Sequence, residues 1–130
     1  MTQQEILEKY PKIFQEKDLP MEQTCMCWGL DVPTSWLPII DQLCASFSCG
    51  WTNQHMETLP QVVAKQVKEK FGELRFYYEL VPEKPRGEMT EEEQGALDDH
   101  RKYIDGKIDF ASDLCRNLRS FTEELAKDQL

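Results

Sequence analysis

The sequence predicts an α+β fold, with a short antiparallel β-hairpin packed against about three helices in a single domain, residues 1–130. Residues 61–80 hold the densest run of β-branched and aromatic residues, and apolar stripes at helical spacing lie on both sides of it. A chain of 130 residues with 40% apolar residues is long enough to bury a core and is not typical of disorder.

The first helix is predicted to start at the N-terminus. Thr2, followed three residues later by Glu5, is a capping-box pattern. The apolar residues of this helix share one face and are Ile6, Leu7 and Tyr10. Pro11 should end or kink it, because an interior proline removes a backbone donor and clashes with the preceding turn.

A second helix is predicted after turns at residues 28–33. Thr34 or Ser35 is expected to cap it, and Pro38 then falls in its first turn, where a missing N–H costs little. Its apolar stripe consists of Trp36, Ile39, Ile40, Leu43 and Phe47. Gly50 is the expected end, and residues 51–60 are expected to form a loop.

Residues 61–70 are ambiguous. Val63, Val67 and Phe71 are spaced four apart, as in a helix, but β-branched residues favour a strand. Residues 74–80 alternate between apolar and polar side chains, as in a strand with one buried face. A lone strand needs a partner, so we predict a hairpin that turns near residues 71–73. A helix over residues 61–70 is the alternative.

The last element is predicted to be a long helix that follows a Pro- and Gly-containing connector at residues 81–89. Thr90 and Glu93 form a second capping box, and Gly106 is a position where the helix can bend. Apolar residues recur every seven positions at Leu97, Ile104, Ala111, Leu118 and Leu125. Such repeats can indicate a coiled coil, but in a mixed chain we favour a helix laid across a sheet.

The charge balance is acidic, with 24 Asp and Glu against 15 Lys and Arg and a net charge of −9. Such a chain is not expected to wrap nucleic acid over a broad face, but it suits a basic protein partner. The predicted partner-binding residues are Glu91, Glu92, Glu93, Asp98, Asp99, Arg75 and Tyr77. Compensation of the helix dipole and solubility are the alternative roles for these carboxylates.

The N-terminus lacks the features of a signal peptide, and no apolar run approaches the length of a membrane helix. We therefore expect a cytoplasmic protein with mostly reduced cysteines. The weak candidates for zinc ligands are Cys25, Cys27, Cys49 and His55. In an extended loop Cys25 and Cys27 would point to the same side, but the C-x2-C pairs of structural zinc sites are missing. Cys44 and Cys115 lie on apolar helix faces, where free cysteine acts as a small hydrophobe.

No catalytic residues and no cofactor are predicted. Cys27 or Cys49 with His55 is the nearest nucleophile–base pair, and nothing in the sequence arranges it. Asp41 is expected to be partly exposed or in a local salt bridge. A basic cluster interleaved with aromatic residues could instead stack a single nucleic-acid strand; it comprises Lys65, Lys68, Lys70, Arg75, Phe76, Tyr77 and Tyr78.

Three segments, in order, carry a resemblance: W-L-P-I-I-D-x-L-C (36–44), V-K-E-K-F-G-x-L-R-F-Y-Y (67–78) and Y-I-D-G-x-I-x-F-A (103–111). Together they resemble a family of small uncharacterised proteins of bacteriophages and prophages, over residues 1–115. Members often carry a C-x-x-C-G pair after the third segment, and here that place reads Cys115-Arg116-Asn117-Leu118.

The resemblance implies a phage-encoded accessory protein in the bacterial host cytoplasm, and it supplies no catalytic residues. The expected function is therefore non-enzymatic: binding a host protein through an acidic surface and modulating or inhibiting it. The expected host protein is, for example, a component of a defence system such as CRISPR. The alternative is a small zinc-dependent or single-strand nucleic-acid-binding protein.

Overall fold

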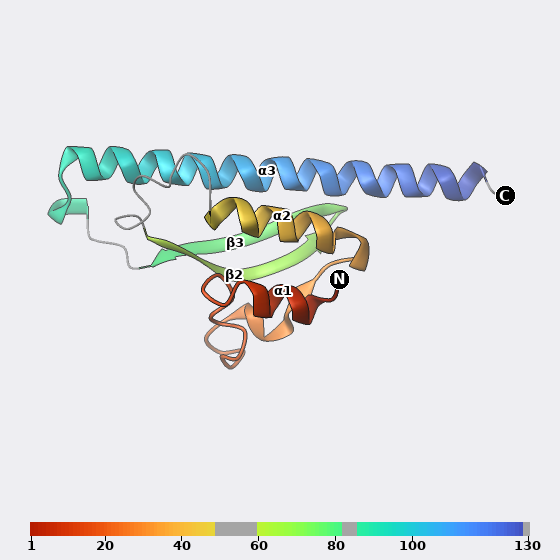
Figure 1. The fold of residues 1–130 in the computed structure, drawn as a ribbon, viewed down its shortest axis with the longest axis horizontal. Helices are drawn as coiled ribbons and strands as arrows, with labels where there is room; N and C mark the ends of the chain where they lie inside the picture. Colours follow the sequence, from red (N-terminus) through yellow and green to blue (C-terminus); the bar gives the residue numbers. More distant parts are fainter. Residues whose placement is uncertain (49–59, 82–85, 129–130) are drawn as a thin grey trace.

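The computed structural model describes residues 1–48, 60–81 and 86–128, and it confirms the α+β class (Figure 1). The α-helices of the described residues are α1 (Gln3–Lys9), α2 (Leu37–Ser48) and α3 (Glu91–Asp128). They accompany a sheet of β1 (Leu30–Asp31), β2 (Gln61–Lys70) and β3 (Glu73–Val81) in the order β1-β2-β3.

The predicted hairpin is confirmed, because β2 and β3 pair antiparallel along their whole length. The alternative of a helix at residues 61–70 is wrong. Strand β1 was not expected, since residues 28–33 were interpreted as turns. Instead Leu30 pairs with Val67 of β2 in parallel. A strand of only two residues carries too little alternation to be recognised in the sequence, and its partner lies far along the chain.

Helices α2 and α3 lie on the face of the sheet that carries the buried residues of β3, namely Leu74, Phe76 and Leu80. The ring of Phe47 in α2 meets the ring of Phe76 edge-on, with centroids 5.7 Å apart. Helix α3 runs beside α2 and along β3, and α1 contacts α2 (Figure 1). The predicted alternation of residues 74–80 therefore has one side in the core.

Helix α1 follows the prediction. The Thr2 Oγ1 accepts a hydrogen bond of 3.1 Å from the backbone N–H of Glu5, and the helix ends at Lys9, before Pro11. The chain then passes the edge of β2, where the N–H of Ala64 donates to the carbonyl of Ile13 at 2.8 Å. The N-terminal segment is thereby fixed to the central strand of the sheet.

Helix α2 starts differently from the prediction. A 3-10 helix at Thr34–Trp36 precedes it, and Pro33 occupies the cap position with no side-chain hydrogen bond. The expected cap at Thr34 or Ser35 is therefore wrong, because both residues are already inside the helical turn. Pro38 does lie in the first turn of α2. Gly50 and the loop expected at residues 51–59 lie outside the described residues.

Helix α3 begins as predicted, with the N–H of Glu93 donating to Thr90 Oγ1 at 3.1 Å. Leu97, Ile104 and Ala111 are buried against β3 and α2, which confirms a helix laid across the sheet. It continues past Gly106 without interruption, and its C-terminal end extends beyond the sheet (Figure 1).

The turn of the hairpin is two residues long, since Lys70 pairs with Glu73. Phe71 and Gly72 both have positive φ, 56° and 79°. A two-residue turn of this kind prefers Asn-Gly, because a bulky side chain is strained in the left-handed region. The side chain of Phe71 is 86% exposed, so it contributes little to the core.

Replacing Phe71 with asparagine is expected to raise the free energy of unfolding by about 1 kcal/mol, because it relieves backbone strain at the turn. Urea unfolding of the variant beside the wild type measures the change. Phe71→Ala is the control, since it removes the ring but keeps a side chain at positive φ. An equal gain in both variants would contradict the assignment of the strain to the backbone.

Candidate protein-binding surface

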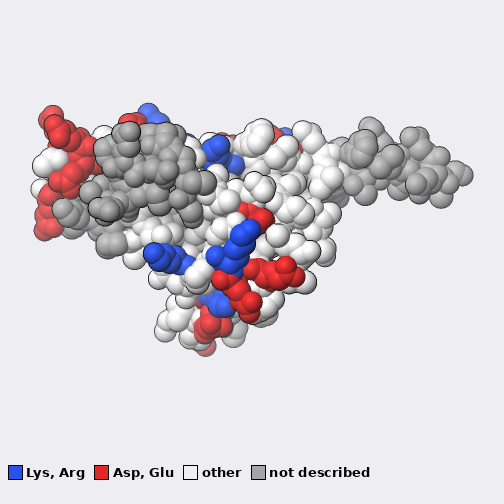
Figure 2. Space-filling model, in the orientation of Figure 1, with Lys and Arg blue, Asp and Glu red and all other residues white. Residues whose placement is uncertain are grey.

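The predicted acidic residues lie at the start of α3. Glu91, Glu92, Glu93 and Asp99 are exposed, and Asp98 is partly buried. Figure 2 shows acidic side chains gathered at the end of the molecule where α3 begins. No lysine or arginine occurs in the sequence between Glu88 and Asp99. The positive end of the helix dipole stabilises the carboxylates of the first turn, Glu91, Glu92 and Glu93, and their exposure leaves them accessible to a partner.

Arg75 and Tyr77 lie elsewhere, on β3. Tyr77 is 48% exposed, and the Lys68 Nζ lies 5.9 Å from the centroid of its ring. Both residues border a groove of about 450 Å³ that lies between β3 and α3. The groove contacts five consecutive residues of β3, residues 73–77, and its helix wall consists of Ile108, Asp109, Ser112, Asp113 and Arg116.

Charges of both signs line this groove. The Arg75 and Arg116 guanidiniums each lie 3.0 Å from a carboxylate oxygen of Glu73. Arg116 also lies 3.7 Å from Asp113. With Asp109, the lining has three carboxylates and two guanidiniums, which leaves one net negative charge. Within the part of the chain that the structure describes, the buried Nε of Arg75 has no hydrogen-bond partner.

The structure thus divides the predicted partner-binding residues between two places. Residues 91 and 108 of α3 are separated by about 25 Å along the helix axis, at 1.5 Å per residue. A standard protein interface spans such a distance, because it buries about 800 Å² on each partner. The acidic start of α3 and the groove can therefore contact one partner together.

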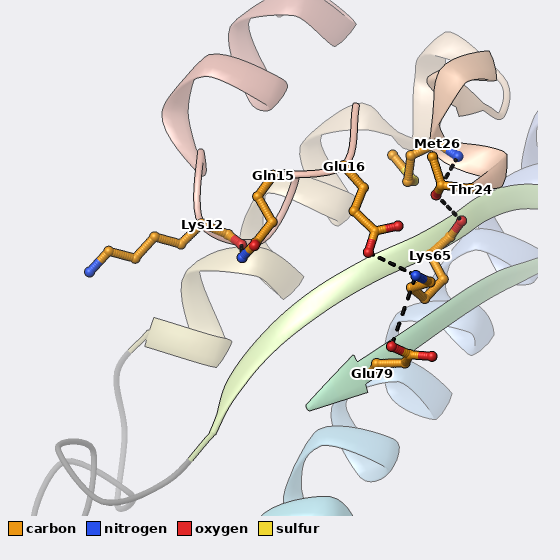
Figure 3. A network of polar contacts seen from close by, with 7 residues as sticks. All are labelled: Lys12, Gln15, Glu16, Thr24, Met26, Lys65 and Glu79. Carbon is orange, nitrogen blue, oxygen red and sulfur yellow. Dashed lines mark hydrogen bonds and ion pairs between the residues drawn. The ribbon is translucent and has the colours of Figure 1, made fainter. Parts of the chain in front are cut away.

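The predicted basic cluster is brought together only in part. Lys68 is the cross-strand partner of Arg75, and the Lys68 Nζ lies 5.9 Å from the centroid of the Tyr77 ring. Lys65 has a different role. Lys65 lies at a bulge in β2, between the register positions of Ala64 and Gln66. Its Nζ lies 2.7 Å from Glu16 and 3.9 Å from Glu79 (Figure 3). The hydrogen bond with Glu16 raises the pKa of Lys65. This lysine ties the segment after α1 to the sheet, and its charge is already compensated.

The same network holds the chain before β1. Thr24 Oγ1 donates to the carbonyl of Lys65 at 3.4 Å and accepts a hydrogen bond of 3.1 Å from the N–H of Met26 (Figure 3). Met26 is buried in the core. The contacts drawn in Figure 3 therefore have a structural role in anchoring residues 12–26 to β2.

The aromatic residues of the basic cluster are divided between the two faces of the sheet. Phe76 is buried, and the Tyr78 hydroxyl donates to Asp105 on α3 at 2.7 Å. Burial and this hydrogen bond raise the pKa of Tyr78. Of the three aromatic residues at positions 76–78, Tyr77 alone is exposed. Stacking of several successive bases on these three residues is therefore not supported.

Asp41 is buried, 7% exposed, and not partly exposed as expected. The Lys9 Nζ lies 3.0 Å from Asp41 Oδ1, and the Tyr10 hydroxyl donates to the same oxygen at 2.8 Å. The salt bridge is confirmed, but it joins α1 to α2 and is not local in sequence. Its members hold the two helices together.

The zinc candidates do not form a site in the described residues. Cys25 and Cys27 are exposed and lie in a 3-10 helix, Cys25–Trp28. The expectation of an extended loop is wrong: with three residues per turn, positions i and i+2 point in different directions. Cys49 and His55 lie outside the described residues. Among the residues described, no three His, Cys, Asp or Glu side chains group as metal ligands.

The remaining described cysteines are expected to be unreactive in the folded protein. Cys44 and Cys115 are buried, and burial raises the pKa of both thiols, that of Cys115 to about 12. Because the thiolate is the reactive form, iodoacetamide should label Cys25 and Cys27 in native buffer and label Cys44 and Cys115 only in urea. Mass spectrometry of digested protein measures each site. Equal native labelling at all four would contradict the burial of these thiols.

The comparisons with known proteins add no relative. No protein-family model matches this chain, and neither a curated protein nor a solved structure matches it. Within the described residues, no helix combines the length and apolar character needed to cross a membrane. The functional assignment therefore depends on the surfaces described above.

Sequence reasoning missed the helix wall of the groove. Asp109, Ser112, Asp113 and Arg116 recur at three- and four-residue spacing, which places them on one side of α3. This spacing was visible in the sequence. The sequence does not show that β3 lies against this side of α3, because Arg116 and Glu73 are 43 residues apart.

Proposed function

We propose that this protein is a non-catalytic binding protein that engages a basic surface of a bacterial host protein and thereby modulates or inhibits it. The observation that carries the proposal is the exposed acidic start of α3, in a chain with a net charge of −9. A binding protein of this kind needs a shaped surface and complementary charge, with no reactive groups. The resemblance to phage-encoded proteins supports a host protein, for example a defence component, as the partner.

Two further features support binding over catalysis. Of the described cysteines, Cys44 and Cys115 are buried and their thiol pKa values are raised. His100 is also buried, and burial lowers its pKa, which favours the neutral form. These groups are placed as core residues. A group of exposed carboxylates, in contrast, lies at the start of α3, where a partner can reach it (Figure 2).

Charge reversal tests the proposal. We expect Glu91→Lys with Glu92→Lys to reduce recovery of the host partner about fivefold, because each reversal replaces an attraction to a basic surface by repulsion. The measurement is affinity capture of the tagged chain from bacterial lysate at moderate salt, with quantitative mass spectrometry.

The matched control is Asp18→Lys with Glu22→Lys, which changes the net charge equally at two exposed carboxylates far from α3 in sequence. Circular dichroism verifies that both variants keep their helix content. Equal loss in both variants, or no loss in either, would refute the assignment of the binding surface to α3.

A further inference from the structure

Among the described residues, no further strand pairs with the outer edge of β3. Strand β3 is the last strand of the sheet order, so only one of its edges pairs with β2. Side chains alternate between the two faces of a strand. Residues 73–77 line the groove consecutively, which favours a groove along the edge of β3, because a groove confined to one face would meet mainly every second side chain.

An edge strand exposes backbone N–H and C=O groups that can pair with another chain. Many proteins cover such an edge with a helix. Here α3 lies along β3, but the groove of about 450 Å³ separates the helix wall from the strand over residues 73–77. The space lies between a strand and a helix, as in several sites that take up an extended peptide.

Two exposed aromatic residues flank the open edge. Phe71 precedes β3 at the tip of the hairpin. Its ring is exposed, and its backbone has a positive φ. Tyr77 borders the other end of the groove. Aromatic side chains are the commonest anchors of protein interfaces. A strand laid along residues 73–77 would meet both rings.

The charges select among possible occupants. Three carboxylates face two guanidiniums in the groove, and Arg116 and Arg75 are already paired with Glu73. Asp109 is exposed. A second copy of this chain would also carry a net charge of −9, which opposes self-association. The complementary occupant is a basic strand.

We infer that the groove between β3 and α3 binds an extended, basic segment of the partner protein, which adds a fourth strand to the sheet at the edge of β3. This inference rests on the proposed function and names how the partner is held. Backbone hydrogen bonds to β3 supply register, and lysine or arginine side chains of the segment meet the exposed Asp109. The acidic start of α3 contacts the same partner about 25 Å away.

A synthetic peptide tests the inference without the partner. The probe is a fluorescently labelled nine-residue peptide that alternates valine with lysine or threonine, measured by fluorescence anisotropy at low salt. We expect the wild type to bind it. A peptide with N-methyl groups on alternate backbone nitrogens should bind at least tenfold more weakly, because N-methylation removes the donors that pair with β3.

Variants locate the site. Ser112→Trp fills the groove and is expected to weaken peptide binding at least tenfold, whereas Asn117→Trp, exposed on the same helix outside the groove lining, should leave it unchanged. Glu91→Lys with Glu92→Lys should change peptide binding by less than threefold. A loss of host capture in that variant with normal peptide binding would separate the two surfaces.

Hydrogen exchange of the wild type gives a readout that needs no variant. The peptide should slow amide exchange in Glu73–Val81. The inference is overturned if the peptide fails to bind, if it binds Ser112→Trp or its N-methylated form equally well, or if an aspartate-containing analogue binds as tightly. A wild-type dimer that Ser112→Trp converts to a monomer would make a second copy the occupant and would also overturn it.

Discussion

Replacing Trp36 with alanine is expected to lower the free energy of unfolding by about 3–5 kcal/mol. Trp36 is 1% exposed and, among the side chains that the structure describes, is the largest that is fully buried. Its removal loses the transfer free energy of the indole and leaves a cavity that the surrounding core can only partly close. Since domains of this size are typically stable by about 5–15 kcal/mol, the variant should be close to the limit of folding.

Urea unfolding, followed by circular dichroism, measures this loss. Trp36→Phe is the graded control, because a phenyl ring refills most of the space and should cost clearly less than alanine. A second control, Phe71→Ala, removes an aromatic ring that is 86% exposed and should change stability by about 0.5 kcal/mol or less. If Trp36→Ala costs under about 1 kcal/mol, the core around the start of α2 is not packed as described.

Replacing Asp41 with alanine is expected to cost about 1.5–3 kcal/mol, the range for hydrogen bonds to a charged group. The carboxylate is buried, and its loss leaves the Tyr10 hydroxyl without its acceptor on Oδ1. Asp41→Asn should be milder, because the amide oxygen still accepts a hydrogen bond. Tyr10→Phe separates the hydroxyl from the rest of the contact and is expected to cost about 0.5–1.5 kcal/mol.

The stability contributed by Asp41 should depend on pH. Burial alone raises the pKa of this carboxyl, but the hydrogen bonds from Tyr10 and Lys9 outweigh burial and lower the pKa below its ordinary value of 3.8. A group whose folded pKa is depressed stabilises the fold above its unfolded pKa and loses that contribution as the pH falls through the folded pKa. The ionised carboxylate therefore stabilises the protein at neutral pH.

We expect the difference in unfolding free energy between wild type and Asp41→Asn to be largest near neutral pH and to shrink below about pH 4. Urea titrations at a series of pH values measure it. A difference that is the same at neutral and acidic pH would contradict a depressed pKa at Asp41. A difference that grows on acidification would indicate that the pKa of Asp41 is raised in the folded protein.

The elements that the sequence predicted correctly are those with strong local signals. Thr2 and Thr90 each form a capping box with a glutamate three residues later, which predicts a helix start. Residues 74–80 alternate between apolar and polar side chains, which predicts a half-buried strand. The ambiguity of residues 61–70 was resolved correctly by the need of β3 for a partner.

The features that sequence reasoning missed depend on contacts between distant residues. Strand β1 exists because Leu30 meets Val67, and Asp41 is buried because Lys9 and Tyr10 approach it from another helix. The groove requires α3 to lie beside β3, so its walls come from residues 31 to 43 positions apart. Arg75 and Tyr77 were chosen for their chemistry, and the space beside them was not foreseen.

The central claim is that the acidic start of α3 contacts a basic host protein. Photo-crosslinking from single positions tests it most directly, with a light-activated residue placed at Glu92 and, as the matched exposed position, at Glu22. We expect a discrete covalent adduct with one bacterial protein from position 92, weakened at high salt, and no such adduct from position 22. The same adduct from both positions, or none from position 92 while the untreated chain still captures a partner, would contradict it.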